Sequence, residues 1–160
     1  MTMIRLYHPQ DAAHVERLIS ELQEFERTLE PSRVEGTPQF AKEALARMLK
    51  RRDERQGRVY VADADGIVIG FTCVLLNGLS PITTITSAAY IAELVVAQTH
   101  RRQGVGRSLL RAAEKYAIEQ SVFTLRLDVL AANSGARALY YSSGLRDFEI
   151  SLTKELTSAE

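Results

Sequence analysis

Hydrophobic positions in the N-terminal part of the chain follow the two periods that distinguish strands from helices. Residues 4–7, in which the apolar Ile4 and Leu6 alternate with Arg5, predict a short first strand. Apolar residues then recur every three or four positions, which predicts an amphipathic helix, at Val15, Leu18, Ile19, Leu22 and Phe25. A second helix is predicted from Pro38 to Leu49, because Thr37 is a favourable cap and proline suits the first helical position. Residues 26–36 between the helices are expected to be a loop.

Residues 59–62 and 67–76 are rich in β-forming residues, and the turn signal Asp65-Gly66 lies between them. Because Asp-Gly accommodates positive φ angles, the two runs are predicted to form a β-hairpin. A further strand is predicted to occupy most of residues 82–97. Its core is nearly continuous apolar sequence, which is typical of a central strand covered on both faces.

The C-terminal half alternates between helix and strand patterns. A helix is predicted after the glycine turn near residue 105, with an inward face made of Val105, Leu109, Ala112, Ala113, Tyr116 and Ala117. Residues 123–130 and 148–152 are predicted strands. Between them, Asn133 or Ser134 caps a helix that is predicted to end at Gly144.

Composition and charge narrow the class of protein. Apolar residues make up 46% of the chain and charged residues 25%, and no internal repeat or linker is visible. Residues 1–160 are therefore expected to form a single domain of the mixed α/β class. Twenty Lys and Arg match twenty Asp and Glu, which argues against a nucleic-acid partner. Cys73 lies in an apolar run and is expected to be a plain core residue in a reducing compartment.

No metal site and no membrane segment are expected from the sequence. The histidines His8, His14 and His100 lie in separate segments without the spacing of metal ligands. No apolar stretch approaches the ~20 residues that span a bilayer, and the N-terminus lacks the apolar region of a signal peptide. A cytoplasmic location is therefore expected.

The segment that carries the chemistry is a buried strand followed by a basic, glycine-containing turn and a helix N-terminus. Gly104 and Gly106 allow a close approach of the backbone to a ligand, and the first N–H groups of the helix have no intrahelical partner. These groups suit a phosphate, and the turn adds positive charge through Arg101, Arg102 and Arg107. On these residues alone, a tight turn with a solvated basic face remains the alternative.

Two common nucleotide-binding motifs do not fit this turn. A P-loop would have glycine in place of Arg101 and lysine in place of Arg107. A dinucleotide-binding Gly-x-Gly-x-x-Gly would have glycine in place of Leu109.

The same segment resembles the acyl-CoA-binding motif, Arg/Gln-x-x-Gly-x-Gly/Ala, of the GNAT superfamily of N-acetyltransferases. Downstream, Leu127-Asp128-Val129 followed by Asn133-x-x-Ala136-x-x-x-Tyr140-x-x-x-Gly144 is similar to the second motif of that superfamily. Two departures are the missing proline at Ala97-Gln98 and the pair Gly144-Leu145 in place of Gly-Phe. The resemblance implies a central mixed, largely antiparallel twisted sheet flanked by about four helices.

The resemblance also implies acetyl-CoA as the acetyl donor. The cofactor-binding residues that it implies are Leu94, Val95, Val96, Arg101, Arg102, Gln103, Gly104, Val105, Gly106, Arg107, Asn133 and Tyr140. The backbone of the glycine turn would hold the pyrophosphate, and the backbone of Leu94 to Val96 would pair with the pantetheine arm. Asn133 would contact CoA, cap its helix, or do both.

Two residues are the catalytic candidates. An amine must be neutral to attack, and Glu93 is the one charged residue of the strand core 90–96, so it is the candidate general base, acting through water. A structural ion pair is the alternative role for Glu93. Tyr140 aligns with the tyrosine that many superfamily members place beside the CoA sulfur and is the candidate general acid, with packing of its helix as the alternative.

The sequence predicts an N-acetyltransferase that acts on a primary amine of a small molecule or peptide. A CoA-binding sensor or interaction domain without transfer activity is the main alternative, and a nucleotide-phosphate-binding enzyme is the other. The acceptor is not identified. An acidic set could line a site for a cationic acceptor or form a solvated helix face: Glu21, Glu24, Glu26, Glu30 and Glu35. Homodimers are common in the superfamily, but no feature of the sequence specifies an interface.

Overall fold

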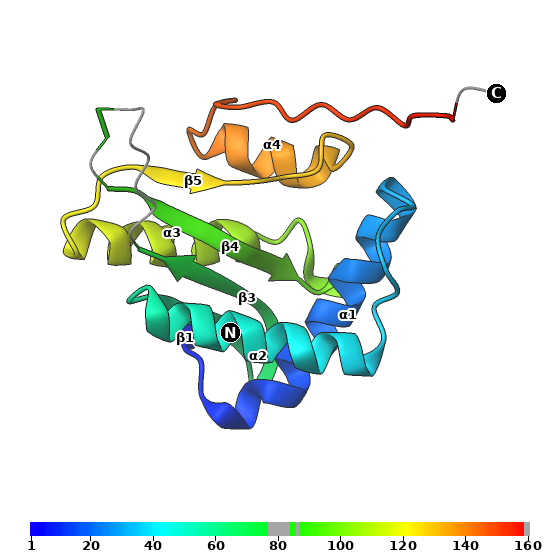
Figure 1. Cartoon of the computed structure of the whole chain (residues 1–160). Coiled ribbons are helices and arrows are strands. Elements are labelled where there is room, and N and C mark those ends of the chain that lie inside the picture. Colours follow the sequence, from blue (N-terminus) through cyan, green and yellow to red (C-terminus); the bar gives the residue numbers. More distant parts are fainter. Residues whose placement is uncertain (77–83, 86, 159–160) are drawn as a thin grey trace.

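The computed structural model describes residues 1–76, 84–85 and 87–158. Its elements in chain order are β1 (Thr2–Leu6), the 3-10 turn η1 (Pro9–Asp11), α1 (Ala12–Leu29), α2 (Pro38–Glu54), β2 (Arg58–Ala64), β3 (Ile67–Leu75), β4 (Ala89–Val96), the 3-10 turn η2 (Gln98–His100), α3 (Val105–Glu119), β5 (Leu125–Leu127) and α4 (Ser134–Ser142). The described strands form one five-stranded sheet in the order β1-β2-β3-β4-β5. Strands β1 to β4 are antiparallel, and β5 pairs in parallel with β4 (Figure 1). The mixed, largely antiparallel sheet confirms the predicted fold class.

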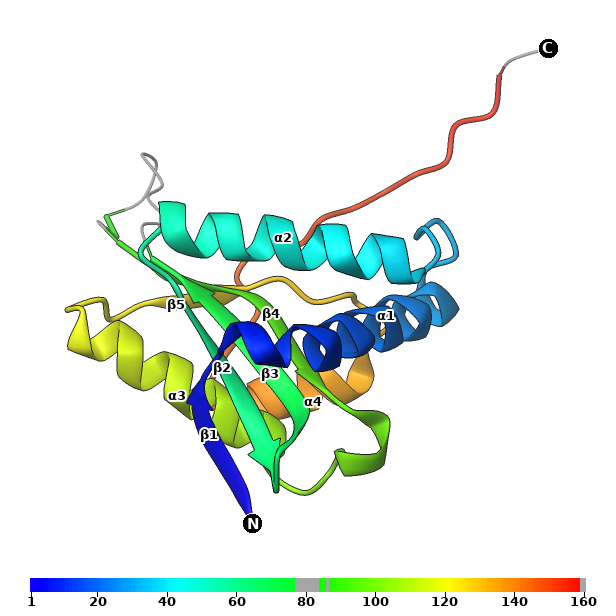
Figure 2. The ribbon, with the colours of Figure 1, turned by 90° about the horizontal axis from the view of Figure 1, so that it is seen from below.

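Helices cover both faces of the sheet. Figure 2 shows α1 and α2 on one side of it and α3 and α4 on the other. Leu18 of α1 and Phe71 of β3 are fully buried in the core on the α1/α2 side. Leu110 of α3 and Ile91 of β4 belong to the core on the other side. Each such buried side chain contributes roughly 1.5–3 kcal/mol through the area it removes from water.

Local signals in the sequence explain several element boundaries. Thr37 caps α2, because its Oγ1 accepts a hydrogen bond of 3.1 Å from the Phe40 N–H. The β2–β3 turn has positive φ angles at Asp65 (53°) and Gly66 (89°), as predicted for this hairpin. Cys73 is fully buried, as predicted for a core residue.

Helix α1 is longer than the apolar stripe predicted. It continues to Leu29, so the predicted loop begins only at Glu30. The stripe continues through Leu22 and Glu26 to Leu29, which places a carboxylate at a position where an apolar residue is usual. This extension brings Glu26 against the sheet.

Strands β4 and β5 are shorter than predicted. Residue 82, where the predicted strand begins, lies outside the described residues, and β4 starts at Ala89. The predicted strand 123–130 is reduced to Leu125–Leu127. Its parallel pairing with β4 ends at Leu127, and residues 128–130 pair with no described strand.

The predicted last strand at residues 148–152 is wrong. This segment is extended but is assigned to no strand, and it leaves the body of the molecule beyond α4 (Figure 2). Alternation of apolar and polar residues gives a segment the pattern of a strand, but a strand also needs an edge with which to pair. In the part of the chain that the structure describes, residues 148–152 pair with no strand.

Candidate active site

A β-bulge in β4 opens the sheet next to β5. Cys73 of β3 lies opposite Glu93, but the next residue, Val74, lies opposite Ile91. Ala92 is therefore an extra residue in β4, and such a residue bends its strand. Pairing with β5 ends at Ile91, which lies beside Leu127. Beyond this point β4 stays paired with β3 alone, and a gap separates it from β5.

The edge of β4 that faces this gap offers main-chain groups that pair with no strand. The Ala97 N–H donates to the Ile69 carbonyl at 2.8 Å, so the main chain of Ala97 faces β3. Because successive residues of a strand direct their backbone groups to opposite sides, Val95 also faces β3, and Leu94 and Val96 face the gap. A ligand in the gap can therefore extend the sheet by pairing with Leu94 and Val96.

The turn before α3 exposes backbone N–H groups near the same edge. Arg102 and Gly104 have positive φ angles of 64° and 84°, which shape the turn into α3. The first bond of the helix runs from the Ser108 N–H to the Gly104 carbonyl (3.0 Å). The N–H groups between them have no partner within the helix, and the positive end of the helix dipole lies there. A Cβ on Gly106 would lie 3.0 Å from Leu139, so glycine at this position allows α3 to pack closely against α4.

Two of the three arginines near the turn hold protein elements together. The Arg101 Nε donates to the Val96 carbonyl at 3.1 Å, and its guanidinium lies 4.9 Å from the centre of the Phe25 ring on α1. Arg107 donates to the Ser142 Oγ at 2.8 Å and so joins α3 to the end of α4. Arg102 is exposed.

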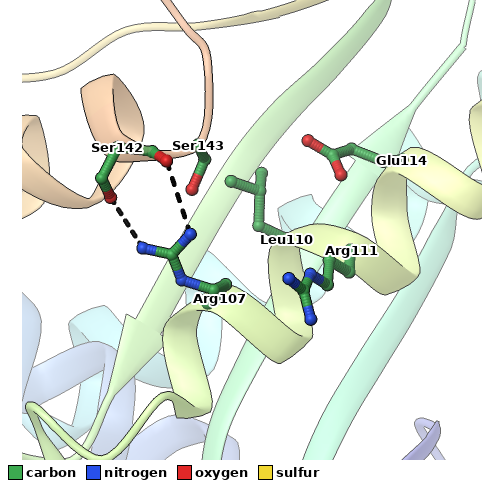
Figure 3. Close-up of a pocket in the computed structure, with 6 residues that line it drawn as sticks. All are labelled: Arg107, Leu110, Arg111, Glu114, Ser142 and Ser143. Carbon is green, nitrogen blue, oxygen red and sulfur yellow. Dashed lines mark hydrogen bonds between the residues drawn. The ribbon is translucent and has the colours of Figure 1, made fainter.

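Arg107 also lines a hollow between α3 and α4, which Figure 3 shows together with its other lining residues: Leu110, Arg111, Glu114, Ser142 and Ser143. The two guanidinium groups at this hollow can donate hydrogen bonds to an anionic group. The hydroxyl groups of Ser142 and Ser143 donate to the Leu139 carbonyl, and Glu114 adds a negative charge to the rim.

Glu93 is a half-buried carboxylate beside the gap. It lies in the bulge region of β4, and its main-chain carbonyl accepts a hydrogen bond of 2.8 Å from the Thr72 Oγ1. Its side chain forms no ion pair and no hydrogen bond with any other described residue. Burial and, to a smaller extent, the charge of Glu26 raise the pKa of Glu93 to about 7. Within the described part of the chain, no partner supports the alternative of a structural ion pair.

Tyr140 approaches the same region from α4. It is buried, with 8% of its surface exposed, and it packs in the core on the α3 side. Burial, followed by the charges of Glu26 and Glu93, raises the pKa of Tyr140 to about 12. Among the described residues its hydroxyl has no hydrogen-bond partner. Glu93, Glu26 and Tyr140 therefore form one electrostatically coupled group.

Glu26 is the member of this group that the sequence did not single out. Its carboxylate is 16% exposed and lies 2.8 Å from Arg33. Burial raises its pKa, and the charge of Arg33 partly opposes this effect. The signal that could have identified it is the continuation of the α1 stripe from Leu22 through Glu26.

Other members of the acidic set bind their own chain. Glu24 accepts from the Gly36 N–H at 2.6 Å, and Glu30 accepts from the Ser32 Oγ at 2.6 Å. Glu21 accepts from the Gln98 N–H at 2.6 Å. These contacts hold Glu21, Glu24 and Glu30 within the protein's own turns and helix contacts. The member of the set whose charge raises the pKa of Glu93 is Glu26.

A tyrosine and an aspartate lie at the end of the gap where β4 and β5 are still paired. The Tyr90 hydroxyl donates to Asp128 at 2.8 Å. Burial, followed by the hydrogen bond to Asp128, raises the pKa of Tyr90 to about 12. Beside them, Arg126 of β5 has a buried Nη2 without a hydrogen-bond partner in the described chain. Asp128 belongs to the second family motif, but no site role was predicted for it. Tyr90 and Arg126 were not predicted as site residues, because no local pattern marks them.

Three predicted site residues remain: Gln103 is exposed in the turn, Val105 is buried at the start of α3, and Asn133 caps α4. Its side-chain oxygen accepts a hydrogen bond of 3.2 Å from the Ala136 N–H. The described residues contain no group of three His, Cys, Asp or Glu that could hold a metal ion. No helix in the described part of the chain is long and apolar enough to cross a membrane.

Comparison with known proteins identifies the family. The model of the Acetyltransferase (GNAT) family matches residues 16–145. The chain belongs to this family. It is 28% identical over 144 residues to YhfO, an uncharacterized N-acetyltransferase of Bacillus subtilis, and the match covers 90% of this chain and 89% of YhfO. It is 26% identical over 102 residues to the N-alpha-acetyltransferase of Sulfurisphaera tokodaii, of which it spans only 61%.

A solved GNAT-like fold matches almost the whole chain. The crystal structure of a mutant BH1408 protein from Bacillus halodurans superposes with a TM-score of 0.81 at 25% identity, covering 97% of this chain and 99% of that chain. The comparisons therefore confirm the predicted family and fold. The roles predicted for individual site residues remain predictions.

Proposed function

We propose that this protein transfers the acetyl group of acetyl-CoA to a primary amine of a small molecule or peptide. The observation that carries the proposal is the Glu93 carboxylate, which is half-buried beside the β4–β5 gap and has no partner among the described residues. A buried carboxylate without a partner is costly to keep in a fold unless it is used. The gap beside it offers both an open strand edge and a helix N-terminus.

The proposed site for CoA combines these two features. The N–H groups from Arg102 to Arg107 and the positive end of α3 accept the pyrophosphate. The pantetheine arm, which carries amide groups, pairs with the open edge of β4 at Leu94 and Val96. The main chain of Val95 faces β3, so its backbone does not join this pairing, and its side chain is buried in the core. The hollow beside Arg107 and Arg111 offers further donors to phosphate groups.

Glu93 is the proposed general base. An alkylamine has a pKa of roughly 10.4 and is almost fully protonated at neutral pH, so it must lose a proton before or during attack. A carboxylate with a pKa of about 7 accepts this proton more readily than an ordinary glutamate does. The amine nitrogen then bonds to the thioester carbon, and the proton passes to Glu93, directly or through one water.

Tyr140 is the proposed general acid. The carbon–sulfur bond breaks as the amide forms, and the departing thiolate takes the hydroxyl proton of Tyr140. Because its pKa is raised to about 12, Tyr140 remains protonated over the whole physiological range. A backbone N–H on the open edge of β4 stabilises the negative charge that develops on the carbonyl oxygen. Amide and free CoA are the products. The proton taken up by Glu93 then passes through solvent to Tyr140, which returns both side chains to their starting protonation states without a further reactant.

Calorimetric titration followed by an activity assay tests this proposal. Purified protein is titrated separately with acetyl-CoA, CoA and Mg-ATP, and CoA thiol release is then measured across a panel of amines. The proposal predicts binding of acetyl-CoA and CoA without binding of Mg-ATP, and amine-dependent thiol release. Binding without release from any amine would favour a CoA sensor, and absence of CoA binding would overturn the proposal.

A further inference from the structure

Arg126 of β5 lies on the face of the sheet that also carries Glu93. In the pairing of β4 with β5, Arg126 lies opposite Tyr90, which packs against the core on the α1/α2 side. Leu127, the next residue of β5, packs on the other side, as the alternation of a strand requires. Glu93 lies opposite Cys73, which is buried in the core on the α1/α2 side. The side chains of Arg126 and Glu93 therefore share this face.

The guanidinium of Arg126 keeps a donor that no described residue accepts. Its Nη2 is buried and has no hydrogen-bond partner in the part of the chain that the structure describes. The ring of Phe148 lies against the guanidinium, 4.3 Å from the guanidinium carbon. An arginine stacked in this way still donates through the edge of its plane. Because buried polar groups nearly always have a partner, a group from outside the chain is expected to supply the acceptor.

Arg51 of α2 is a second cation near the gap. It is exposed and forms no ion pair with any other described residue. Burial is the main cause of the raised pKa values of Glu93 and Tyr90, and the positive charge of Arg51 opposes it at both residues. Because the effect of a charge decays with distance, Arg51 lies close to this part of the gap. Positive charge thus approaches it from α2 as well as from β5.

The carboxylates on this face already have partners or are partly neutral. Glu26 is paired with Arg33 at 2.8 Å, and Asp128 accepts the hydrogen bond of the Tyr90 hydroxyl at 2.8 Å. With its pKa raised to about 7, Glu93 is partly protonated at neutral pH. Among the charged side chains named here, the two arginines of α2 and β5 are the ones without a partner. This side of the gap is therefore suited to an anionic group.

We propose that the acceptor amine also carries a carboxylate, and that Arg126 binds this carboxylate while Arg51 adds positive charge beside it. The inference rests on the proposed function, because it places the amine nitrogen at Glu93. Along β4, Glu93 is three residues from the position opposite Arg126, and one of these residues is the extra residue of the bulge. At ~3.3 Å per residue the two side chains are roughly 7–10 Å apart along the strand. A chain of about five carbon atoms between amine and carboxylate spans this distance.

A matched series of acceptors tests the proposal. CoA thiol release is measured with ω-amino acids from 5-aminopentanoate to 8-aminooctanoate, with alkylamines of the same chain lengths and with the corresponding diamines. At the best chain length the ω-amino acid is expected to exceed both other amines in kcat/KM by roughly tenfold or more. A peptide arm compares the dipeptide amides Ala-Glu and Ala-Gln, so the two arms distinguish a free amino acid from a peptide as the source of the carboxylate.

Replacement of Arg126 locates the carboxylate site. Arg126→Gln is expected to raise KM for 6-aminohexanoate roughly tenfold with little change in kcat, and to leave kcat/KM for hexylamine unchanged. Arg126→Lys keeps the charge and is expected to restore part of the loss. Arg58→Gln is the matched control, because Arg58 also lies against an aromatic ring, 5.1 Å from the centre of the Tyr116 ring, but on the α3 side. The control is expected to behave as the wild type does.

The failure of this inference is distinguishable from the failure of the proposed function. Equal kcat/KM for the acids and their matched neutral amines in both arms would overturn the inference and leave acetyl transfer standing. Thiol release from none of the amines would contradict the proposed function instead. Calorimetric titration of 6-aminohexanoate into the CoA-saturated protein then decides the inference by itself. Binding that Arg126→Gln weakens roughly tenfold supports it, whereas no binding, or equal binding by both proteins, would overturn it.

Discussion

The carboxylate of Glu26 on α1 lies close enough to Glu93 on β4 to add to the effect of burial, and together they bring the pKa of Glu93 to about 7. Glu26 is itself paired with Arg33 at 2.8 Å, so its charge is held in place. A carboxyl whose pKa lies near neutrality exchanges protons readily under working conditions. We infer that Glu26 contributes, after burial, to the protonation state of the proposed base.

Neutralising Glu26 is expected to move the pH dependence of transfer. In Glu26→Gln the like charge beside Glu93 is lost, so the pKa of Glu93 falls, and the midpoint of the rising limb of kcat/KM moves to lower pH. The measurement is CoA thiol release over a range of pH. Glu30→Gln is the matched control, because Glu30 binds Ser32 and does not contribute to the pKa of Glu93. An unchanged midpoint in Glu26→Gln would remove Glu26 from this role.

Glu93 is also expected to make stability depend on pH. The pKa of Glu93 is raised from 4.5 to about 7 in the folded protein. At pH values between these two, the carboxyl is therefore protonated more fully in the folded state than in the unfolded state. Stability therefore falls as pH rises through this window, by at most about 3 kcal/mol at 1.36 kcal/mol for each pKa unit.

The variant Glu93→Gln removes this penalty. Its melting temperature is expected to exceed that of the wild type at pH 8, and the difference is expected to disappear near pH 4. Thermal unfolding of both proteins at the two pH values provides the measurement. An equal difference at both pH values would show that the pKa of Glu93 is not raised on folding.

Loss of the Tyr140 hydroxyl is expected to slow transfer while leaving cofactor binding intact. Removing a general acid costs roughly 10²- to 10⁴-fold in rate, so kcat of Tyr140→Phe should fall by about a hundredfold with an unchanged Kd for acetyl-CoA. Tyr116→Phe is the control, because the Tyr116 hydroxyl bonds the Gln56 carbonyl at 2.6 Å and is expected to affect stability alone. Full activity in Tyr140→Phe would leave this tyrosine with a packing role.

The glycine turn can be tested with a pair of strained variants. Gly104 and Gly66 both have positive φ angles, 84° and 89°, and a Cβ on either would contact nothing within 4 Å. Gly104→Ala and Gly66→Ala should therefore each lose about 1 kcal/mol of stability through backbone strain alone. Gly104→Ala is also expected to weaken acetyl-CoA binding several-fold, and Gly66→Ala is not. Equal affinities for acetyl-CoA in the two variants would separate this turn from the cofactor site.

The features predicted correctly from sequence depend on local chemistry. The Thr37 cap, the Asp65-Gly66 turn and the Asn133 cap each follow from residue types within a few positions of one another. The order of strands and helices as far as α4 followed from apolar periodicity in the same way. The family motif added the position of the glycine turn before α3.

The features that the sequence did not predict depend on pairing between distant segments. The extra residue at Ala92 exists only in relation to the register of β3, so no pattern within β4 marks it. Glu26 enters the site because α1 continues past Phe25, whereas the polar residues after it suggested a loop. In residues 148–152, apolar and polar side chains alternate as they do in a strand. This alternation does not identify a strand edge with which the segment would pair.

The pH dependence of CoA thiol release by the wild type and by Glu93→Gln tests the proposed mechanism most directly. We predict that kcat/KM of the wild type rises with pH through an apparent pKa near 7. In Glu93→Gln the rate at neutral pH should be lower by roughly 10²-fold or more, and it should recover in part at high pH as the free amine becomes neutral. Identical profiles for the two proteins would contradict Glu93 as the general base.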